Sequence, residues 1–328
     1  MTTNNPTHWS AIAEKGTGLG LRILSGFYSL FGRRACLILV VPITTFFYII
    51  DRAGKRNSAQ YLTRIFALKG SSPPTFWTGL QHYINFASKI LDSFIAWTHP
   101  NRTGHFAVHS QASLDQIASR GAGVMLIVSH MGNVEMCRAT LAIRFKRQVT
   151  VLVHTRHAET YNNLIKSVRP DAESNVMQVT EVGPETAIAL QERIERGEWI
   201  AIAGDRTPVT GQSRVSNVPF LGKSAPFSQG PYILAALMGC PVYLLFCIRS
   251  NDGHDVYFEQ FSDAITLPRK DKDAALSALA ARYAQRLEHY CLMAPLQWYN
   301  FFDFWAAPAA SPEVAAGKLS VAAPPKQT

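Results

Sequence analysis

Apolar and polar positions along the chain follow two alternating patterns. Short runs rich in β-branched residues, bounded by turn residues, predict buried strands. Between them, apolar residues recur at helical spacing on one face. From about Gly104 onward the two kinds of segment alternate: expected strands span 105–109, 123–129, 148–154, 175–180, 198–203, 241–249 and 254–261, and expected helices span 112–119, 134–145, 159–168, 184–196, 228–238 and 271–292. This order predicts an α/β fold with a mixed, mostly parallel central sheet flanked by helices.

The region before this core is predicted to be helical and contains the longest apolar segment. Residues 35–50 carry no charge and lie between two pairs of charged residues. As a helix this segment measures about 24 Å, short of the ~30 Å hydrocarbon core of a bilayer, and Pro42 is expected to kink it. An interfacial or partly inserted membrane anchor is therefore favoured over a full span, and a buried core helix is the alternative. A second helical region, 59–98, is interrupted at 70–74.

Composition divides the chain into three parts. Residues 1–70 form a basic and apolar membrane-anchoring region, residues 71–305 form the main α/β domain, and residues 306–328 are an Ala/Pro-rich segment expected to be a disordered tail. The formal net charge is +9, and residues 1–70 hold nine Lys or Arg against two acids. Basic residues beside an apolar segment fit an anionic cytoplasmic membrane surface.

Other partners and compartments are less consistent with these patterns. No helix-turn-helix, zinc-finger or RNA-binding signature accompanies the basic charge, so nucleic acid is not an expected partner. The first ten residues lack the basic start of an ordinary signal peptide. Five scattered cysteines without paired spacing argue against a disulfide framework or structural zinc, and favour a reducing compartment. The protein is therefore expected to face the cytoplasm.

The strongest candidate for chemistry follows the buried run 124–128. This run ends in Ser129-His130, and Glu135 lies five positions further on. Inside one helix the two side chains would be roughly 140° apart, but a histidine in the turn and a glutamate in the first helical turn can converge. A histidine oriented by a carboxylate suits a general base, and backbone N–H groups from Gly132 to Val134 are candidates to stabilise developing negative charge. A histidine with a purely structural hydrogen bond is the alternative.

Two further polar segments follow expected strands. Residues 155–157 come after one strand, and Asp205-Arg206 come after another. Because parallel strands end at one edge of a sheet, these residues and His130 are expected to gather there, although a charged pair can also simply cap a loop. Residues 219–230 are small and turn-prone, which fits either close approach by a chain-like ligand or an ordinary loop. No G-x-S-x-G elbow, P-loop or metal-ligand spacing is present, so no metal or bound cofactor is expected.

In order along the chain, the H-x4-E box, the DRTP block and a PFLG…LA…G-x-P-V pattern that ends at Arg249 resemble the lysophospholipid acyltransferase superfamily. The order and spacing are most similar to its lipid A biosynthesis (late) acyltransferase branch. The closing aromatic segment, 298–305, is similar too, and the resemblance covers roughly residues 15–305. The glycerolipid branch tends to carry NHxSxxD and EGTR where this chain has SHMGNVE and GDRTP, which argues against a glycerol-3-phosphate acceptor.

The resemblance implies acyl transfer from an acyl-thioester, usually acyl carrier protein and sometimes coenzyme A, to a hydroxyl of a membrane lipid or glycolipid. It implies the inner membrane as location, with the active site facing the cytoplasm. His130 is implied as general base and Glu135 as its orienting partner. Residues implied in or placed near substrate binding are Asn133, Arg156, Arg169, Asp205 and Arg206.

Two other classes of function remain open. A non-catalytic membrane-surface protein with this fold would bind lipid without turnover. A membrane-associated glycosyl- or phosphotransferase would use Asp205 with a metal and would be sensitive to chelators. The identity of the acceptor, the acyl chain length and the donor are not specified by the pattern.

Overall fold

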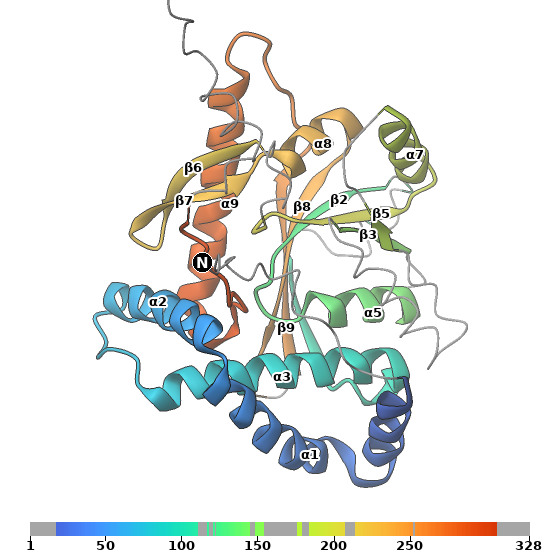
Figure 1. The fold of residues 1–328 in the computed structure, drawn as a ribbon. Coiled ribbons are helices and arrows are strands. Elements are labelled where there is room, and N and C mark those ends of the chain that lie inside the picture. Colours follow the sequence, from blue (N-terminus) through green and yellow to red (C-terminus); the bar gives the residue numbers. More distant parts are fainter. Residues whose placement is uncertain are drawn as a thin grey trace, which may run out of the picture.

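The computed structural model describes residues 18–110, 117, 121, 123–144, 148–153, 176–178, 184–206, 214–251 and 253–306. The predicted α/β fold is confirmed: seven strands form one sheet in the order β1-β9-β8-β2-β5-β3-β4 (Figure 1). The five strands from β8 to β4 run parallel, while β9 is antiparallel to β8 and pairs in parallel with β1. The strands span β1 (His105–Ser110), β2 (Met125–Val128), β3 (Val149–Val153), β4 (Val176–Gln178), β5 (Trp199–Ala203), β8 (Val242–Arg249) and β9 (Gly253–Ser262).

Helices cover both faces of this sheet. Helix α5 (Val134–Arg144) packs on one face, where alternate residues of β2, β5 and β8 form a hydrophobic cluster with it. The opposite residues of the same strands pack against α7 (Pro184–Glu195), α8 (Gly230–Met238) and α9 (Lys272–Met293). Each of these helices matches a predicted one. The helices expected at 112–119, of which only Ile117 is described, and at 159–168 lie outside the described residues.

A two-stranded hairpin was not predicted. Most of the turn-prone segment 219–230 belongs to the hairpin of β6 (Val215–Phe220) and β7 (Lys223–Ser228), which pair in an antiparallel ladder joined by a turn whose two central residues have positive φ. Pro219 and Pro226 lie within these strands, and proline is typical of edge strands rather than of central ones. The hairpin packs Phe220 and Phe227 against the aromatic C-terminal segment.

The N-terminal segment forms one long helix that is broken once. Helix α1 (Gly18–Ile50) is interrupted at Gly32, whose φ of 74° places it in the left-handed region. Pro42, where a kink is expected, lies within the helix, and the interruption among the described residues of α1 is ten residues earlier, at Gly32. After α1 come α2 (Arg52–Leu68) and α3 (Phe76–Thr98), and two short 3₁₀ turns (Pro100–Arg102 and Pro295–Gln297) complete the described helices.

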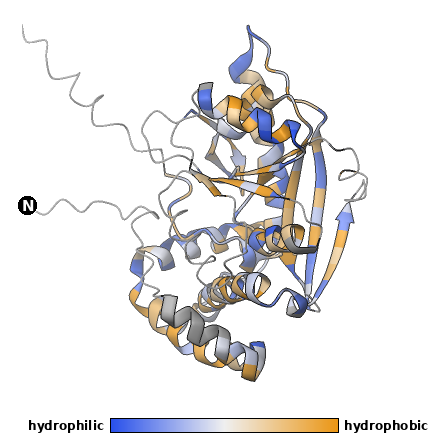
Figure 2. Ribbon diagram, turned by 90° about the vertical axis from the view of Figure 1, so that its right-hand side faces the viewer, coloured by the Kyte–Doolittle hydropathy of each residue, from blue (hydrophilic) through white to orange (hydrophobic). Residues whose placement is uncertain are grey.

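Helix α1 lies antiparallel along α3 (Figure 1). Near its start Tyr28 packs on His99, in the middle Arg33 pairs with Asp92, and near its end Tyr48 packs on Phe76. Most of the other large apolar side chains between residues 26 and 50 are exposed, and Figure 2 shows many hydrophobic positions along this edge of the molecule. By length and composition alone, 26–50 would suffice to cross a membrane. The exposed apolar residues are Leu30, Phe31, Ile38, Leu39, Ile43, Phe46, Phe47, Ile49 and Ile50.

Candidate active site

The candidate site lies at the carboxyl edge of the sheet, where β2 and β5 end side by side. Val128 pairs with Ala203 in parallel register, so the residues that follow these strands are neighbours in space. His130 comes two residues after the end of β2, and Asp205 comes two residues after the end of β5. The predicted gathering of these two polar groups at one edge of the sheet is thus present in the structure.

The imidazole of His130 is hydrogen-bonded to Asp205. Nδ1 of His130 lies 2.9 Å from Oδ1 of Asp205, and the backbone N–H of His130 donates to Oδ2 at 2.8 Å. Asp205 has no exposed surface, whereas the His130 side chain is 43% exposed. A carboxylate can only accept, so this contact places the ring proton on Nδ1 and leaves the lone pair of Nε2 available.

Charges around the pair set their protonation states. Burial alone would raise the pKa of the Asp205 carboxyl, but the charges of His130 and Arg206 and the hydrogen bonds from His130 outweigh it and hold that pKa far below its usual range. Burial lowers the pKa of the His130 imidazole, and the charges of Arg206 and Lys89 lower it further, against the opposing effect of Asp205. The pair therefore consists of an ionised carboxylate and a neutral imidazole near pH 7.

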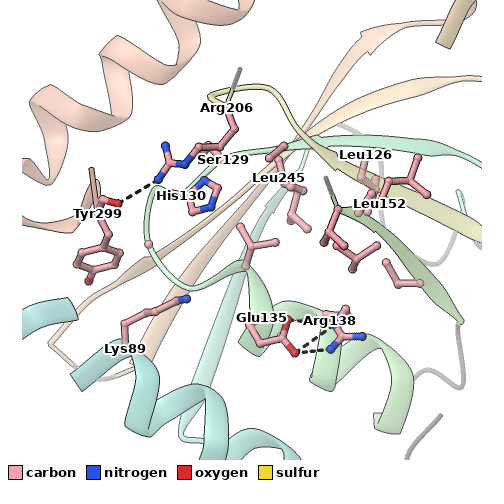
Figure 3. Close-up of a pocket in the computed structure, with 18 of the residues that line it drawn as sticks. Lys89, Leu126, Ser129, His130, Glu135, Arg138, Leu152, Arg206, Leu245 and Tyr299 are labelled. Atoms are coloured by element: carbon pink, nitrogen blue, oxygen red, sulfur yellow. Dashed lines mark hydrogen bonds and ion pairs between the residues drawn. The ribbon is translucent and has the colours of Figure 1, made fainter. Parts of the chain in front are cut away.

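Glu135 does not make the predicted contact with His130. Its Oε1 accepts from the indole Nε1 of Trp97 at 2.7 Å, and its carboxylate pairs with Arg138, whose Nε lies 3.0 Å from Oε2. In Figure 3 the Glu135 side chain turns toward Arg138 on α5. The orienting partner of the imidazole is consequently Asp205, because the strand order places it closer to His130 than the residue five positions along the chain.

A support that the sequence did not predict comes from the C-terminal segment. The indole Nε1 of Trp298 donates to Oδ2 of Asp205 at 2.9 Å. The carbonyl of Trp298 is held in turn by His82 of α3, whose other ring nitrogen contacts Ser58 of α2. Burial lowers the pKa of His82 to about 4, so this histidine is a neutral structural link. Helices α2 and α3 thereby fix the carboxylate that orients His130.

The backbone N–H groups expected to receive negative charge are mostly occupied. Gly132 donates to the carbonyl of Gln297 at 2.7 Å, and Asn133 donates to the carbonyl of Cys247 at 2.6 Å. This close approach requires glycine at 132, where φ is 67° and an added Cβ would overlap the Cys247 carbonyl. The predicted donors at Gly132 and Asn133 are therefore structural, and of the predicted set only Val134 has no such role.

The remaining predicted substrate residues fall into three groups. Arg206 lines the pocket, donates to the carbonyls of Asp205 and Tyr299, and stacks on Phe302. The Asn133 side chain ties α5 to α3 through hydrogen bonds with Ser93, Met136 and the Lys89 carbonyl. Arg156 and Arg169 lie outside the described residues, as does the whole 155–157 segment.

A second basic residue, which was not predicted from the sequence, reaches the pocket from α3. Lys89 is the one Lys or Arg in that helix, and Figure 3 shows its amine pointing toward the space between His130 and Glu135. Burial lowers its pKa, with Glu135 opposing and Arg206 adding to the effect. A lysine in a long apolar helix is the sequence signal that was available.

An apolar channel leads from His130 between the sheet and α5. The cavity measures about 280 Å³. Its polar residues, including Lys89, His130, Glu135 and Arg206, lie among aliphatic side chains from the four parallel strands β2, β3, β5 and β8 and from α5 (Figure 3). Those aliphatic residues are Leu126, Val128, Val134, Leu141, Val149, Val151, Leu152, Val153, Ala201, Ala203 and Leu245. The arrangement joins a base at the mouth to a compartment that suits a hydrocarbon chain.

Candidate metal ligands do not gather in the part of the chain that the structure describes: no group of three His, Cys, Asp or Glu side chains has suitable geometry there. All five cysteines are buried thiols.

The family described as bacterial lipid A biosynthesis acyltransferase matches residues 80–306, well over half of the chain and including His130, Asp205 and the residues that line the channel. A comparison with curated proteins finds no matching sequence.

Proposed function

Because this chain belongs to the bacterial lipid A biosynthesis acyltransferase family, we propose that it transfers a fatty acyl group from an acyl-thioester, on acyl carrier protein or coenzyme A, to a hydroxyl of a membrane glycolipid. The observation that carries the proposal is the His130–Asp205 pair at the mouth of an apolar channel. The pair supplies a base with a defined tautomer, and the channel supplies space for the acyl chain. Neither a metal nor a cofactor is needed for this chemistry.

The proposed reaction begins with proton removal. Nε2 of His130 takes the proton of the acceptor hydroxyl as its oxygen attacks the thioester carbonyl carbon. Asp205 stabilises the imidazolium that forms, because it is ionised and hydrogen-bonded to Nδ1. The tetrahedral intermediate then breaks its C–S bond, the thiolate takes the proton from His130, and an ester and a thiol are released. General-base assistance of this type is worth about 10²–10⁴-fold.

The oxyanion of the intermediate needs a donor other than the occupied Gly132 and Asn133 amides. We assign this role to Lys89, with the Val134 N–H at the start of α5 as a second donor. The Lys89 charge is near enough to lower the pKa of His130, and its amine points into the same space. Arg206 borders the mouth of the channel and is available for an anionic group of either substrate.

Channel depth is expected to select the acyl chain. Ala201 lies two residues before Ala203 on β5, so it lines the channel about 6.6 Å deeper than the mouth. Replacing Ala201 with Leu is expected to shift the transferred chain to shorter lengths, with about tenfold or more discrimination for each methylene that no longer fits. Leu126→Ala, on the neighbouring strand, is the matched variant and is expected to shift the preference to longer chains.

Lipid mass spectrometry of cells that produce the wild-type chain or each variant measures this directly. The wild-type chain is expected to give a lipid species with one additional acyl group, and the mass of that species identifies both acceptor and chain. Unchanged chain lengths in both variants would show that the acyl group lies elsewhere, and absence of any added acyl group would contradict the proposed function.

The acidic limb of the pH–rate profile is expected to depend on Arg206. Its positive charge lowers the pKa of His130, so the base stays neutral at more acidic pH than a free imidazole does. Arg206→Gln removes that charge, which raises the pKa of His130 and moves the acidic limb of kcat/KM to higher pH. Arg206→Lys retains the charge and is expected to leave the limb in place. If the acidic limb of kcat/KM lies at the same pH in the wild-type enzyme and in Arg206→Gln, a group other than His130 is responsible for it.

Helix α1 supports a place for the enzyme at the membrane surface. It packs along α3 through Tyr28, Arg33 and Tyr48, while most of its other large apolar side chains between residues 26 and 50 are exposed. A helix fixed to the globular body at both ends and in the middle fits an interfacial anchor better than a span. We propose that residues 1–70 anchor the enzyme to the cytoplasmic face of the inner membrane and that residues 71–305 form the acyltransferase domain.

A further inference from the structure

A second, polar pocket lies across the 131–133 segment from the apolar channel. It is bounded by α3, by the end of β8 and by the start of β9, and it shares Lys89, Gly132 and Tyr299 with the channel as a common wall. A contiguous pocket extends it to Tyr28 and Arg33 of α1. The proposed mechanism uses none of the groups that lie at its centre, which are Asp92, Arg249 and His254.

This pocket carries more positive than negative charge among its described residues. Asp92 is 5% exposed and is already paired with Arg33, whose Nε and Nη2 lie 2.7 and 3.0 Å from its two oxygens. Arg249 reaches the same carboxylate only through one longer contact of 3.4 Å. The single negative charge of Asp92 is therefore shared by two guanidinium groups, and Lys89 adds a third positive charge to the wall of the pocket.

Arg249 is held in place by its backbone rather than by its side chain. Gln297 clamps the backbone of Arg249 from both sides, accepting from its N–H at 2.8 Å and donating to its carbonyl at 2.9 Å. The Arg249 side chain remains 42% exposed at the pocket. Partial burial and the neighbouring charge of Arg33 lower its pKa against the effect of Asp92, so an added anion would stabilise it. Arg249 is also the residue at which the last sequence motif ends.

His254 lines the pocket from the start of β9. It is 6% exposed, and its Nδ1 has no hydrogen-bond partner in the described part of the chain. Burial lowers its pKa to about 4, with Asp92 opposing and the charges of Arg249 and Arg33 adding to the effect, so its imidazole is neutral. Because Nδ1 is enclosed by protein, His254 forms part of the wall of the pocket, and Arg249 presents the exposed donors.

We propose that this pocket binds a phosphate group on the headgroup of the acceptor lipid, with Arg249 as its main ligand. The inference rests on the proposed function, because it assigns the pocket to the acceptor of that reaction. A guanidinium fork matches two phosphate oxygens. Helix α1, which carries the exposed apolar residues, also forms part of the wall of this pocket. The pocket therefore lies next to the surface proposed to contact the membrane, which favours a phosphate carried by a membrane lipid over the phosphates of a soluble donor. The shared wall at Lys89 and Tyr299 lets such a lipid reach His130.

The test measures binding without any turnover. Titration calorimetry would follow n-dodecyl phosphate in dodecyl maltoside micelles binding to the full chain, to Arg249→Gln and to Arg249→Lys. Arg56→Gln removes an exposed charge of α2 and controls for general attraction to anionic micelles. We expect Arg249→Gln to weaken binding about tenfold or more, the size of one lost charge-assisted hydrogen bond, and Arg249→Lys to weaken it less. Circular dichroism checks that the half-exposed position tolerates each change.

Two further probes identify the source of the phosphate. Inorganic phosphate is expected to bind much more weakly than dodecyl phosphate, and coenzyme A is not expected to displace dodecyl phosphate. Displacement by coenzyme A, or binding of inorganic phosphate as tight as that of the lipid analogue, would overturn the assignment to the acceptor. Equal losses in Arg249→Gln and Arg56→Gln, or no loss in Arg249→Gln, would overturn the subsite itself. Because no acyl donor is present, these results are independent of whether His130 catalyses transfer.

Discussion

Replacing His130 with Ala is expected to reduce acyl transfer by about 10²–10⁴-fold while leaving membrane association unchanged. The loss follows because no other described base lies at the mouth of the channel with a defined lone pair. Asp205→Asn is expected to cause a comparable loss, since an amide does not fix the Nδ1–H tautomer or stabilise the imidazolium. The measurement is the rate of acyl incorporation, with vesicle co-sedimentation as the check on membrane binding.

The double variant makes this prediction sharper. If His130 and Asp205 act as a unit, removing both is expected to cost no more than removing His130 alone. Asp273→Asn, an exposed position in the first turn of α9, is the matched control and is expected to keep full activity. Activity of His130→Ala within a few-fold of wild type would contradict the assignment of the base. Additive losses in the double variant would mean that Asp205 acts on something other than His130.

The fold was largely predictable because its signals are local. Each of the seven sheet strands lies within two residues of a predicted segment, since apolar runs bounded by turn residues depend only on neighbouring positions. The hairpin formed by β6 and β7 was missed because its prolines and small residues match a loop, and it is stabilised by packing on distant aromatic residues. Helix α1 was predicted only as residues 35–50, because Arg33-Arg34 interrupt the apolar pattern.

The candidate site was predictable only in part, because its decisive contacts depend on strand order. That His130 and Asp205 follow strands is visible in the sequence, but that β2 and β5 are neighbours is not. Without the strand order, the nearest carboxylate along the chain, Glu135, was the natural partner. Trp298 and Lys89 were missed for the same reason, since each reaches the site from an element distant in sequence.

Replacing Glu135 with Gln is expected to lower stability by about 3 kcal/mol and to lower activity with it. The Glu135 carboxylate lies 2.5 Å from Nη2 of Arg138, a side chain that is only 4% exposed, and it accepts from Trp97 as well. Gln keeps an acceptor for the indole but removes the negative charge beside the buried guanidinium. Thermal unfolding and acyl incorporation of the same preparations measure the two losses.

A compensated variant separates a structural glutamate from a catalytic one. Glu135→Gln combined with Arg138→Met removes both charges and fills the volume of the guanidinium with an apolar side chain, so most of the stability is expected to return. If Glu135 serves to hold Arg138 and Trp97 in place, activity is expected to return to within about tenfold of wild type, because His130 keeps Asp205. Stability that returns without activity would contradict this interpretation. It would mean that Glu135 takes a direct part in the reaction, although its carboxylate is hydrogen-bonded to Trp97 and Arg138.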